Sequence, residues 1–285
     1  MYKNQLCIAL SDSFGLNSED QIRLMKKIGF SGFFFGWSAG KDFSSLLKTA
    51  REENMFLQSV HAPFTKMADF WKPTARTQEA IDELLACVSD CAAFGAPIMV
   101  VHPFIGFTEH EPTDFGLKNY EIIVSAAKEA GVKIAFENTE GEEYLEALMK
   151  YFEKDENVGF CWDTGHEMCY NYSKDLLALY GGRLLCTHLN DNLGIRDDGG
   201  EITWIDDLHL LPFDGAADWQ DIVSRLNRCG FDGPLTFELT TASKPGRHEN
   251  DAYARMSPEE YLTNAYIRAC RVAMLKERMK RTVSA

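Results

Sequence analysis

Six acidic or imidazole side chains stand at the ends of successive apolar runs of this sequence. A buried strand alternates its side chains between two faces, so a polar group late in an apolar run is either costly or useful. One such residue could be a hydrogen-bonded core histidine. Six of them, all of types that bind metals and move protons, indicate one shared site. They are His61 in LQSVHAPF, His102 in IMVVHPF, Glu137 in KIAFENT, Asp163 in VGFCWDTGH, His188 in LLCTHLND and Glu238 in PLTFELT.

Four of these six residues form a mixed carboxylate and imidazole set, namely Glu137, Asp163, His188 and Glu238. Such donors favour Mn²⁺, Zn²⁺, Co²⁺ or Mg²⁺ over a metal that prefers thiolates. A cation held there can polarise a carbonyl or hydroxyl oxygen and stabilise an enediolate. The alternative is that each of the four is a separately paired buried polar group, and their common placement favours the metal site over that alternative.

The elements that must position these residues repeat in a rhythm of strand, polar turn and amphipathic helix. Apolar or β-branched runs predict strands at residues 5–11, 32–37, 56–62, 97–103, 132–139, 158–164, 184–190 and 234–240. Helical patterns follow them at residues 18–29, 42–54, 74–95, 114–131, 141–154, 173–182, 218–230 and 257–281. This alternation over 285 residues predicts an α/β fold, a (β/α)8 TIM barrel, whose active site lies at the carboxyl ends of the strands. The six residues fall at those ends.

We expect a single domain over residues 1–285, because no G-x-G-x-x-G follows the first strand and no Pro-, Gly- or Ser-rich linker interrupts the chain. The segment 190–218 is the main irregularity, since a connection of that length is uncommon unless it is functional. It follows the seventh strand and should cover the barrel mouth. It carries two further potential ligands, Asp207 and His209. The last helix, 257–281, opens with a capping box of Ser257 and Glu260.

The composition narrows the range of partners. The formal net charge of −14 disfavours a nucleic-acid partner, which needs Lys and Arg to neutralise phosphates, but it allows a small phosphorylated substrate. No run of about 18 apolar residues predicts a membrane span, and no secretion signal is visible at the start. The eight cysteines are scattered, which is typical of reduced, mostly buried thiols in a cytoplasmic protein.

Aromatic side chains also stand at or after several strand ends. Sugar sites often use aromatic faces, so one or two of these rings could line a pocket, whereas ordinary packing explains most of them. The residues are Phe35, Trp37, Phe64, Trp71, Phe104, Phe107 and Trp204.

Several motifs along nearly the whole chain resemble the sugar phosphate isomerase/epimerase family of xylose isomerase-like barrels. That family also includes ketose 3-epimerases, inosose dehydratases and metal-dependent apurinic endonucleases. The W-D-T-G-H and H-x-x-D pieces are fairly specific. The matching segments are HAPF at 61–64, HPF at 102–104, FEN at 136–138, WDTGH at 162–166, THLND at 187–191, DLHLLPFDGAADW at 207–219 and GPLTFEL at 233–239.

The resemblance implies a role for each matching residue. Glu137, Asp163, His188 and Glu238 match the four metal ligands of the epimerase branch. The two glutamates also match its acid/base pair, which moves protons on opposite faces of the sugar. The implied activity is a divalent-metal-dependent isomerase or epimerase that acts on a ketose or related polyol through an enediolate. The residues implied to bind substrate are His61, His102, His166, Arg196, Asp207 and His209.

Other activities remain open at this stage. An inosose-type dehydratase or lyase needs the same proton abstraction. In the endonuclease branch, equivalents of these same histidines and carboxylates hold three zinc ions for phosphodiester hydrolysis, so more than one Zn²⁺ is an alternative to a single Mn, Zn, Co or Mg ion. A non-catalytic sugar-binding subunit is the last alternative. We expect a small sugar or sugar phosphate as partner, with no nucleic acid and no membrane, and a homo-oligomer stays open.

Overall fold

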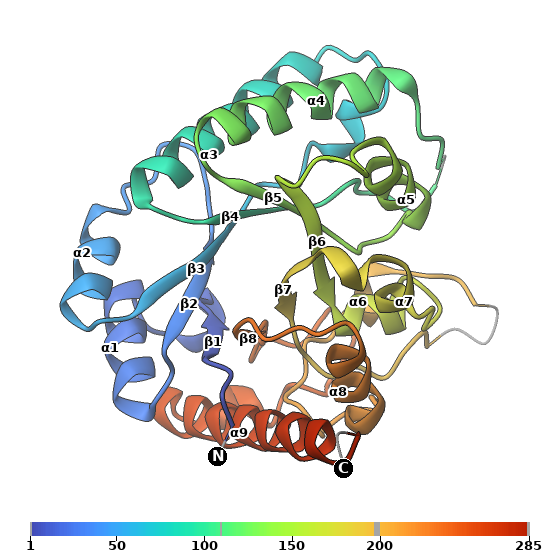
Figure 1. Cartoon of the computed structure of the whole chain (residues 1–285). Coiled ribbons are helices and arrows are strands. Elements are labelled where there is room, and N and C mark those ends of the chain that lie inside the picture. The colour runs from blue at the N-terminus through green and yellow to red at the C-terminus, as the bar shows by residue number, and fades with distance from the viewer. Residues whose placement is uncertain (1, 109, 197–199, 284–285) are drawn as a thin grey trace.

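Eight parallel strands form the centre of the computed structural model, which describes residues 2–108, 110–196 and 200–283. The helices lie around the outside of the strands (Figure 1). The strands are β1 (Leu6–Ala9), β2 (Gly32–Gly36), β3 (Phe56–His61), β4 (Ile98–Val101), β5 (Lys133–Glu137), β6 (Val158–Asp163), β7 (Leu184–His188) and β8 (Leu235–Phe237).

The strands close into a barrel in sequence order. Each strand pairs in parallel with the next from β1 to β7, and β1 also pairs with β8 through Cys7 and Thr236. The gap between β7 and β8 is bridged by backbone hydrogen bonds, in which Leu189 N donates to Thr236 O at 2.8 Å and Glu238 N donates to Leu189 O at 3.2 Å. The (β/α)8 barrel expected from the alternating pattern is thereby confirmed.

Most helices between the strands follow the amphipathic patterns of the sequence, although no pattern predicted the helix at Thr164–Cys169 and the one expected over 173–182 spans only Leu176–Tyr180. The helices are α1 (Ser18–Ile28), α2 (Ser44–Glu52), α3 (Thr77–Phe94), α4 (Asp114–Glu129), α5 (Glu142–Tyr151), α6 (Thr164–Cys169), α7 (Leu176–Tyr180), α8 (Trp219–Arg228) and α9 (Pro258–Val283). Short 3₁₀ turns occur at η1 (Asp12–Phe14), η2 (Met67–Phe70), η3 (Gly181–Arg183), η4 (Trp204–Asp206) and η5 (Tyr253–Arg255). Helix α9 lies beside both α1 and α8 along the outer surface (Figure 1).

Local chemistry explains where two of these helices begin. The Ser257 hydroxyl accepts the backbone N–H of Glu260 at 3.2 Å, as the capping box predicted, and Pro258 opens α9. The expected strand over 158–164 ends one residue earlier, since α6 starts at Thr164. The carboxylate of Asp163 caps this helix by accepting the backbone N–H of His166 at 2.7 Å. A candidate site residue is therefore also a helix cap.

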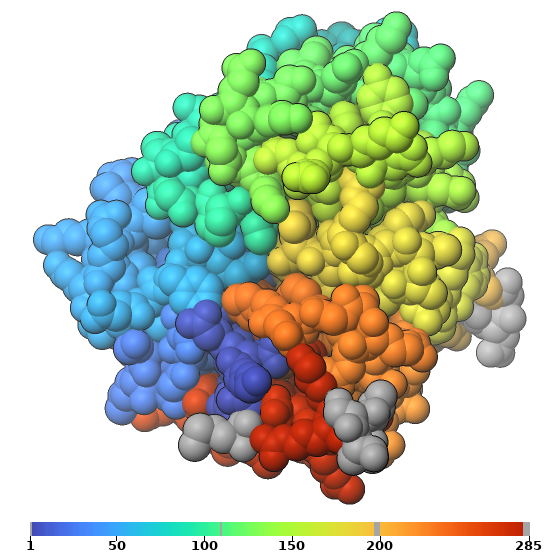
Figure 2. All heavy atoms as spheres, viewed as in Figure 1, coloured from blue at the N-terminus to red at the C-terminus, as the bar shows by residue number. Residues whose placement is uncertain are grey.

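Small side chains fill the barrel interior one layer below the six polar residues. Each lies two positions before one of the six, so it points to the same side of its strand. They are Ser59, Val100, Ala135, Cys161, Cys186 and Thr236, all at most 1% exposed. In the space-filling view, atoms fill the middle of the face toward the viewer and no open channel is visible there (Figure 2). This layer of buried side chains closes the barrel interior beneath the six polar residues.

Two further expectations concern cysteines and membranes. All eight cysteines lie in the described residues and are free thiols, and six of them are buried, as the scattered pattern predicted. Among the helices of the described ranges, none has both the length and the apolar character needed to cross a bilayer.

Candidate active site

The six polar residues gather at one mouth of the barrel. His61, Glu137, Asp163 and His188 are the last residues of β3, β5, β6 and β7. His102 and Glu238 come immediately after β4 and β8. The carboxyl ends of parallel strands meet at one end of a barrel, so the placement at strand ends is the reason that they converge. The shared site predicted from the sequence is therefore present as a spatial cluster.

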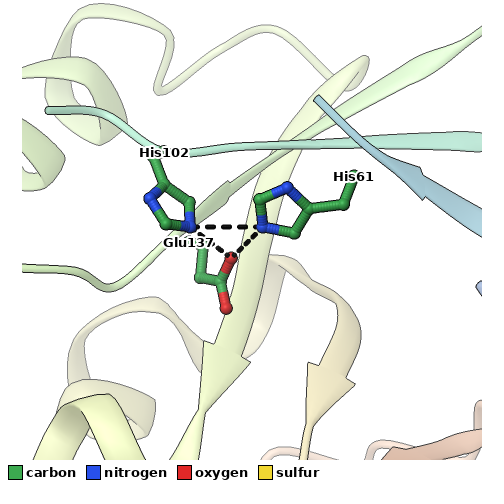
Figure 3. Close-up of side chains that lie close together, drawn as sticks. All are labelled: His61, His102 and Glu137. Atoms are coloured by element: carbon green, nitrogen blue, oxygen red, sulfur yellow. Dashed lines mark hydrogen bonds and ion pairs between the residues drawn. The ribbon is translucent and has the colours of Figure 1, made fainter. Parts of the chain in front are cut away.

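Glu137 lies at the centre of this cluster and is fully buried. Its Oε2 atom faces two imidazoles, with His61 Nε2 at 3.2 Å and His102 Nε2 at 3.3 Å, and the two Nε2 atoms are 3.2 Å apart (Figure 3). His61 Nδ1 lies 2.8 Å from the carbonyl oxygen of Ala62, which can only accept, so Nδ1 carries a proton. With Nδ1 engaged by the Ala62 carbonyl, Nε2 is the His61 atom that faces the centre of the group.

The other oxygen of Glu137 faces His188. His188 Nδ1 lies 2.8 Å from Glu137 Oε1 and 3.0 Å from Glu238 Oε2. One nitrogen and two carboxylate oxygens thus face the same point, an arrangement that a shared cation would satisfy. Phe34 stacks on the His188 ring, with centroids 4.4 Å apart and planes 8° apart, and holds the imidazole in this orientation.

Together with Asp163, these residues make a group whose ligand atoms all lie within 4.8 Å of one another. We call it the four-ligand set, and its members are Glu137, Asp163, His188 and Glu238. Three carboxylates and one imidazole are the donors that Mn²⁺, Zn²⁺, Co²⁺ and Mg²⁺ accept. The donor types, their spacing and the two-carboxylate contact of His188 fit a divalent cation.

Two asparagines hold Asp163 in place. Asn190 Nδ2 donates to both carboxylate oxygens, at 3.1 and 2.9 Å. Asn138 accepts the backbone N–H of Asp163 at 2.8 Å and donates to its carbonyl at 2.9 Å. All three residues are fully buried. Hydrogen bonds of this kind orient ligating carboxylates and are commonly needed for metal affinity. Neither asparagine was singled out from the sequence, although both stand in the FEN and THLND segments.

Burial and neighbouring charges act in opposite directions on the two glutamates. Burial alone would raise the pKa of Glu137, but the charge of His188 and hydrogen bonds from His102, His188 and His61 hold it well below its usual range. Burial likewise opposes ionisation of Glu238, yet His188 lowers the pKa of this group to about 2. Both glutamates are therefore ionised near neutral pH.

Burial dominates at Asp163, whose pKa rises to about 6 despite the attraction of His166. Burial also lowers the pKa of His102, against the pull of Glu137. At His188 the opposing charges of Glu137 and Glu238 outweigh burial and raise the pKa well above its ordinary value. Opposed shifts of this kind, at Asp163, His102 and His188, are typical of metal and catalytic sites.

A second group lies beside the four-ligand set and is formed by His166, Asp207 and His209, which we call the mouth trio. Asp207 Oδ1 is 2.8 Å from His209 Nε2 and 3.5 Å from His166 Nε2. Lys244 binds the other oxygen of Asp207 at 3.1 Å. The long connection over 190–218 thus delivers Asp207 and His209 to the barrel mouth, as its length suggested.

Side-chain hydrogen bonds hold the short helix α6, which carries His166, in place. Glu167, the next residue, accepts hydrogen bonds from Trp162 Nε1 at 2.8 Å and from Arg225 Nη1 at 2.6 Å. His166 Nδ1 lies 3.0 Å from the carbonyl oxygen of Asn138 and 3.7 Å from Glu137 Oε1. His166 therefore stands between the four-ligand set and the mouth trio.

Arg196 occupies a different position. Its side chain is exposed, and its backbone N–H donates to Asp206 Oδ2 at 3.1 Å. Within the described residues its guanidinium makes no hydrogen bond or ion pair with the four-ligand set. A substrate-binding role for Arg196 stays a prediction.

Comparison with known proteins agrees with this geometry. A family model described as a xylose isomerase-like TIM barrel matches residues 22–261. The uncharacterized protein y4fM of Sinorhizobium fredii is 31% identical over 174 residues, which are 56% of this chain and 53% of that protein. The chain thus spans about half the length of this curated relative.

Two solved structures share the fold over nearly their whole length. The IolI protein, described with a bound zinc atom, has a TM-score of 0.74 and 19% identity, and the match covers 94% of this chain and 98% of that one. An L-ribulose 3-epimerase also has a TM-score of 0.74, with 15% identity over 99% of this chain and 98% of that one. From the match to the family model and the closed barrel, we conclude that this chain belongs to the xylose isomerase-like TIM barrel family.

Proposed function

We propose that this chain is a divalent-metal-dependent sugar isomerase or epimerase that moves a proton on a ketose or related polyol. The observation that carries the proposal is the pair of glutamates, Glu137 and Glu238, held at 2.8 and 3.0 Å from the same nitrogen of His188. The likeness to an L-ribulose 3-epimerase and to a zinc-containing barrel supports this class of activity.

In the proposed reaction the two glutamates transfer the proton. One carboxylate removes the proton from the carbon next to the substrate carbonyl, which leaves an enediolate, and the other returns a proton from the opposite face. Both groups can accept a proton at neutral pH, because both are ionised. A divalent cation bound by the four-ligand set would polarise the substrate oxygen beside it. General acid/base catalysis of this kind contributes roughly 10²–10⁴-fold.

The two glutamates differ in their access to water. Glu137 is fully buried, so a proton that it takes is shielded from solvent, whereas the Glu238 side chain is 25% exposed and can exchange its proton. We assign Asp163 and His188 as metal ligands. The proposed substrate contacts, in addition to Arg196, are His61, His102 and the mouth trio of His166, Asp207 and His209. The same proton abstraction followed by loss of a β-hydroxyl would make an inosose-type dehydratase.

One observation favours a second candidate, a zinc-cluster phosphodiesterase. Besides the four-ligand set and an overlapping group of Glu137, Cys161 and His188, two groups offer ligand atoms within 4.8 Å of one another: the mouth trio, and His61 with His102 and Glu137. Three adjoining groups have room for more than one cation. The strongly acidic charge weighs against this candidate, because DNA affinity rests largely on basic side chains.

The test of the proposed function is proton exchange in D₂O. Metal-loaded protein is incubated with a panel of ketopentoses and ketohexoses, and deuterium next to the carbonyl is followed by NMR. We expect incorporation with at least one ketose, and a loss of about 10²-fold or more in both Glu137→Gln and Glu238→Gln. Glu129→Gln, on the exposed face of α4, is the matched control and should be fully active.

Full exchange by Glu137→Gln would contradict the mechanism. Cleavage of DNA with an abasic site, without exchange on any ketose, would favour the phosphodiesterase.

A further inference from the structure

A cavity of about 350 Å³ opens beside the four-ligand set on the side of β8. It shares Glu238 and His209 with the candidate active site, so a substrate held at Glu238 has this cavity as its immediate neighbour. The other walls come from the end of β1, from η4 and from the loop after β8. They include Ser11, Trp204, Thr240, Ala242, Ser243 and Lys244. None of these residues is used by the proposed proton transfer.

Trp204 presents a partly open aromatic face to this cavity. The residue is 48% exposed, although its backbone is firmly held at the start of η4. The Thr203 hydroxyl caps the turn, and the neighbouring Asp206 carboxylate is 1% exposed and forms an ion pair with the buried Arg247. Several large apolar side chains of the described residues are as exposed as Trp204, and what distinguishes this indole is its place on the wall of a cavity that also contains Glu238.

The charges around the cavity disfavour an anionic ligand. Lys244 is its basic wall residue, but Lys244 Nζ lies 3.1 Å from Asp207 Oδ2 and 5.6 Å from the centre of the Trp204 ring. Its charge is therefore matched by a carboxylate that is itself buried. Glu238 adds a negative charge at the inner end. His209, a further wall residue, is paired with the same Asp207, whose Oδ1 lies 2.8 Å from His209 Nε2. The remaining polar lining consists of hydroxyl groups from Ser11, Thr240 and Ser243.

These features fit a neutral ligand that has hydroxyl groups and a flat apolar face. A sugar ring has both, since its C–H groups can pack on an indole while its hydroxyls meet polar walls. The volume lies at the small end of ligand pockets, which run from roughly 300 to 1,000 Å³, so one ring fits and a long chain does not.

We propose that this cavity, bounded by Trp204 and the loop after β8, is a subsite for a second, uncharged sugar ring. The inference rests on the proposed function and specifies its substrate class: a ketose that carries a glycosyl group on a hydroxyl remote from its carbonyl. A free ketose leaves the subsite empty. A ketose phosphate would place a dianion next to the negative charge of Glu238. Lys244 would offset that repulsion poorly, because its charge is already paired with Asp207.

The test compares D-fructose, D-fructose 6-phosphate and two glucosyl-fructoses, maltulose and isomaltulose, which carry the glucosyl group on O4 and O6 respectively. Saturation-transfer NMR reports binding without turnover, and deuterium exchange reports catalysis. We expect saturation of the glucosyl protons of at least one disaccharide, and affinity about tenfold or more above that of fructose. Absence of glucosyl saturation at the highest soluble concentration, or preference for fructose 6-phosphate, would overturn the inference.

Three variants separate the subsite from the reacting centre. Trp204→Ala should remove the advantage of the disaccharide and leave fructose unchanged, whereas Trp204→Tyr should retain most of it. Ala242→Phe, on the cavity wall, should exclude the second ring by filling its space. Phe115→Ala removes an exposed aromatic of α4 that does not line this cavity and should change nothing. An equal loss for fructose and disaccharide in Trp204→Ala would also overturn the inference.

The two readouts distinguish the two proposals. Trp204-dependent disaccharide binding without deuterium exchange would refute the isomerase while supporting the sugar subsite. Exchange on fructose that is indifferent to Trp204→Ala and to the glucosyl group would refute the subsite while supporting the isomerase.

Discussion

The buried carboxylate of Asp191 determines how the long connection after β7 is held at the barrel mouth. Asp191 is fully buried and accepts four hydrogen bonds. Its Oδ1 accepts the backbone N–H groups of Asn192 at 2.9 Å and Ala217 at 3.0 Å. Its Oδ2 accepts the Phe213 N–H and the Trp219 indole N–H, both at 2.8 Å. The residue therefore ties β7 to the loop that leads into α8.

The substitution Asp191→Asn keeps the shape of the side chain but replaces one acceptor oxygen with an NH₂ donor. Two of the four buried N–H groups then face another donor. An unsatisfied buried donor costs about 1–3 kcal/mol, so we expect the free energy of unfolding to fall by about 4 kcal/mol. For a chain of this size, 1 kcal/mol shifts Tm by about 2–4 °C, so Tm should fall by about 8–16 °C.

The assay is urea unfolding followed by tryptophan fluorescence, together with a thermal melt. Asp218→Asn is the matched control in the same loop. Asp218 is exposed and caps α8, and asparagine caps a helix about as well as aspartate, so the control should stay within about 0.5 kcal/mol of the parent. A loss below about 1 kcal/mol in Asp191→Asn, or equal losses in both variants, would refute this account of the loop.

Three further predictions concern the four-ligand set. In Gly165→Ala the new Cβ would lie 2.0 Å from Asn190 Oδ1, so the Asn190 side chain must move and release Asp163. Calorimetric titration should then show a metal affinity about 10–100-fold lower. Unchanged affinity would contradict this role of Asn190. In the metal-free protein Glu137 and Glu238 outweigh burial and raise the pKa of His188, so His188 is protonated at neutral pH and must lose that proton to bind metal. The affinity for metal should therefore fall as the pH falls. Calorimetry in buffers of different ionisation enthalpy should detect about one proton released per metal ion bound. No proton release would contradict the assignment of His188 as a metal ligand. Phe34→Ala removes the buried ring stacked on His188 and should cost about 3–5 kcal/mol in urea unfolding, whereas a cost below about 1 kcal/mol would show that the stack is unimportant.

The apolar runs predicted the part of the site that belongs to the strands. His61, Glu137, Asp163 and His188 end their strands as expected, because the strand period and the parallel barrel leave few other places for them. The barrel itself follows from the same alternation. A pattern confined to single strands is enough to position these side chains.

The contacts between distant segments could not be predicted in the same way. Phe34 lies on β2 and meets His188 on β7 across the barrel, and Lys244 reaches Asp207 from another loop. No periodicity encodes such pairs, since they depend on how loops pack over the mouth. The place of Asn190 in the site could have been predicted from the sequence, because this residue stands two positions after His188 on the same side of the chain. The strand pattern alone did not indicate that Asp163, a proposed metal ligand, also caps a helix.

Metal content per chain tests the central claim most directly. Elemental analysis of protein purified without added metal, and again after equilibration with Mn²⁺, Zn²⁺, Co²⁺ or Mg²⁺, should find about one divalent ion per chain. A double variant, Asp163→Asn with His188→Gln, should lose it while the Glu129→Gln control retains it. Two or three zinc ions per chain would favour the phosphodiesterase. No bound metal under any of these conditions would contradict the account, because it would leave the four-ligand set without the cation that its geometry fits.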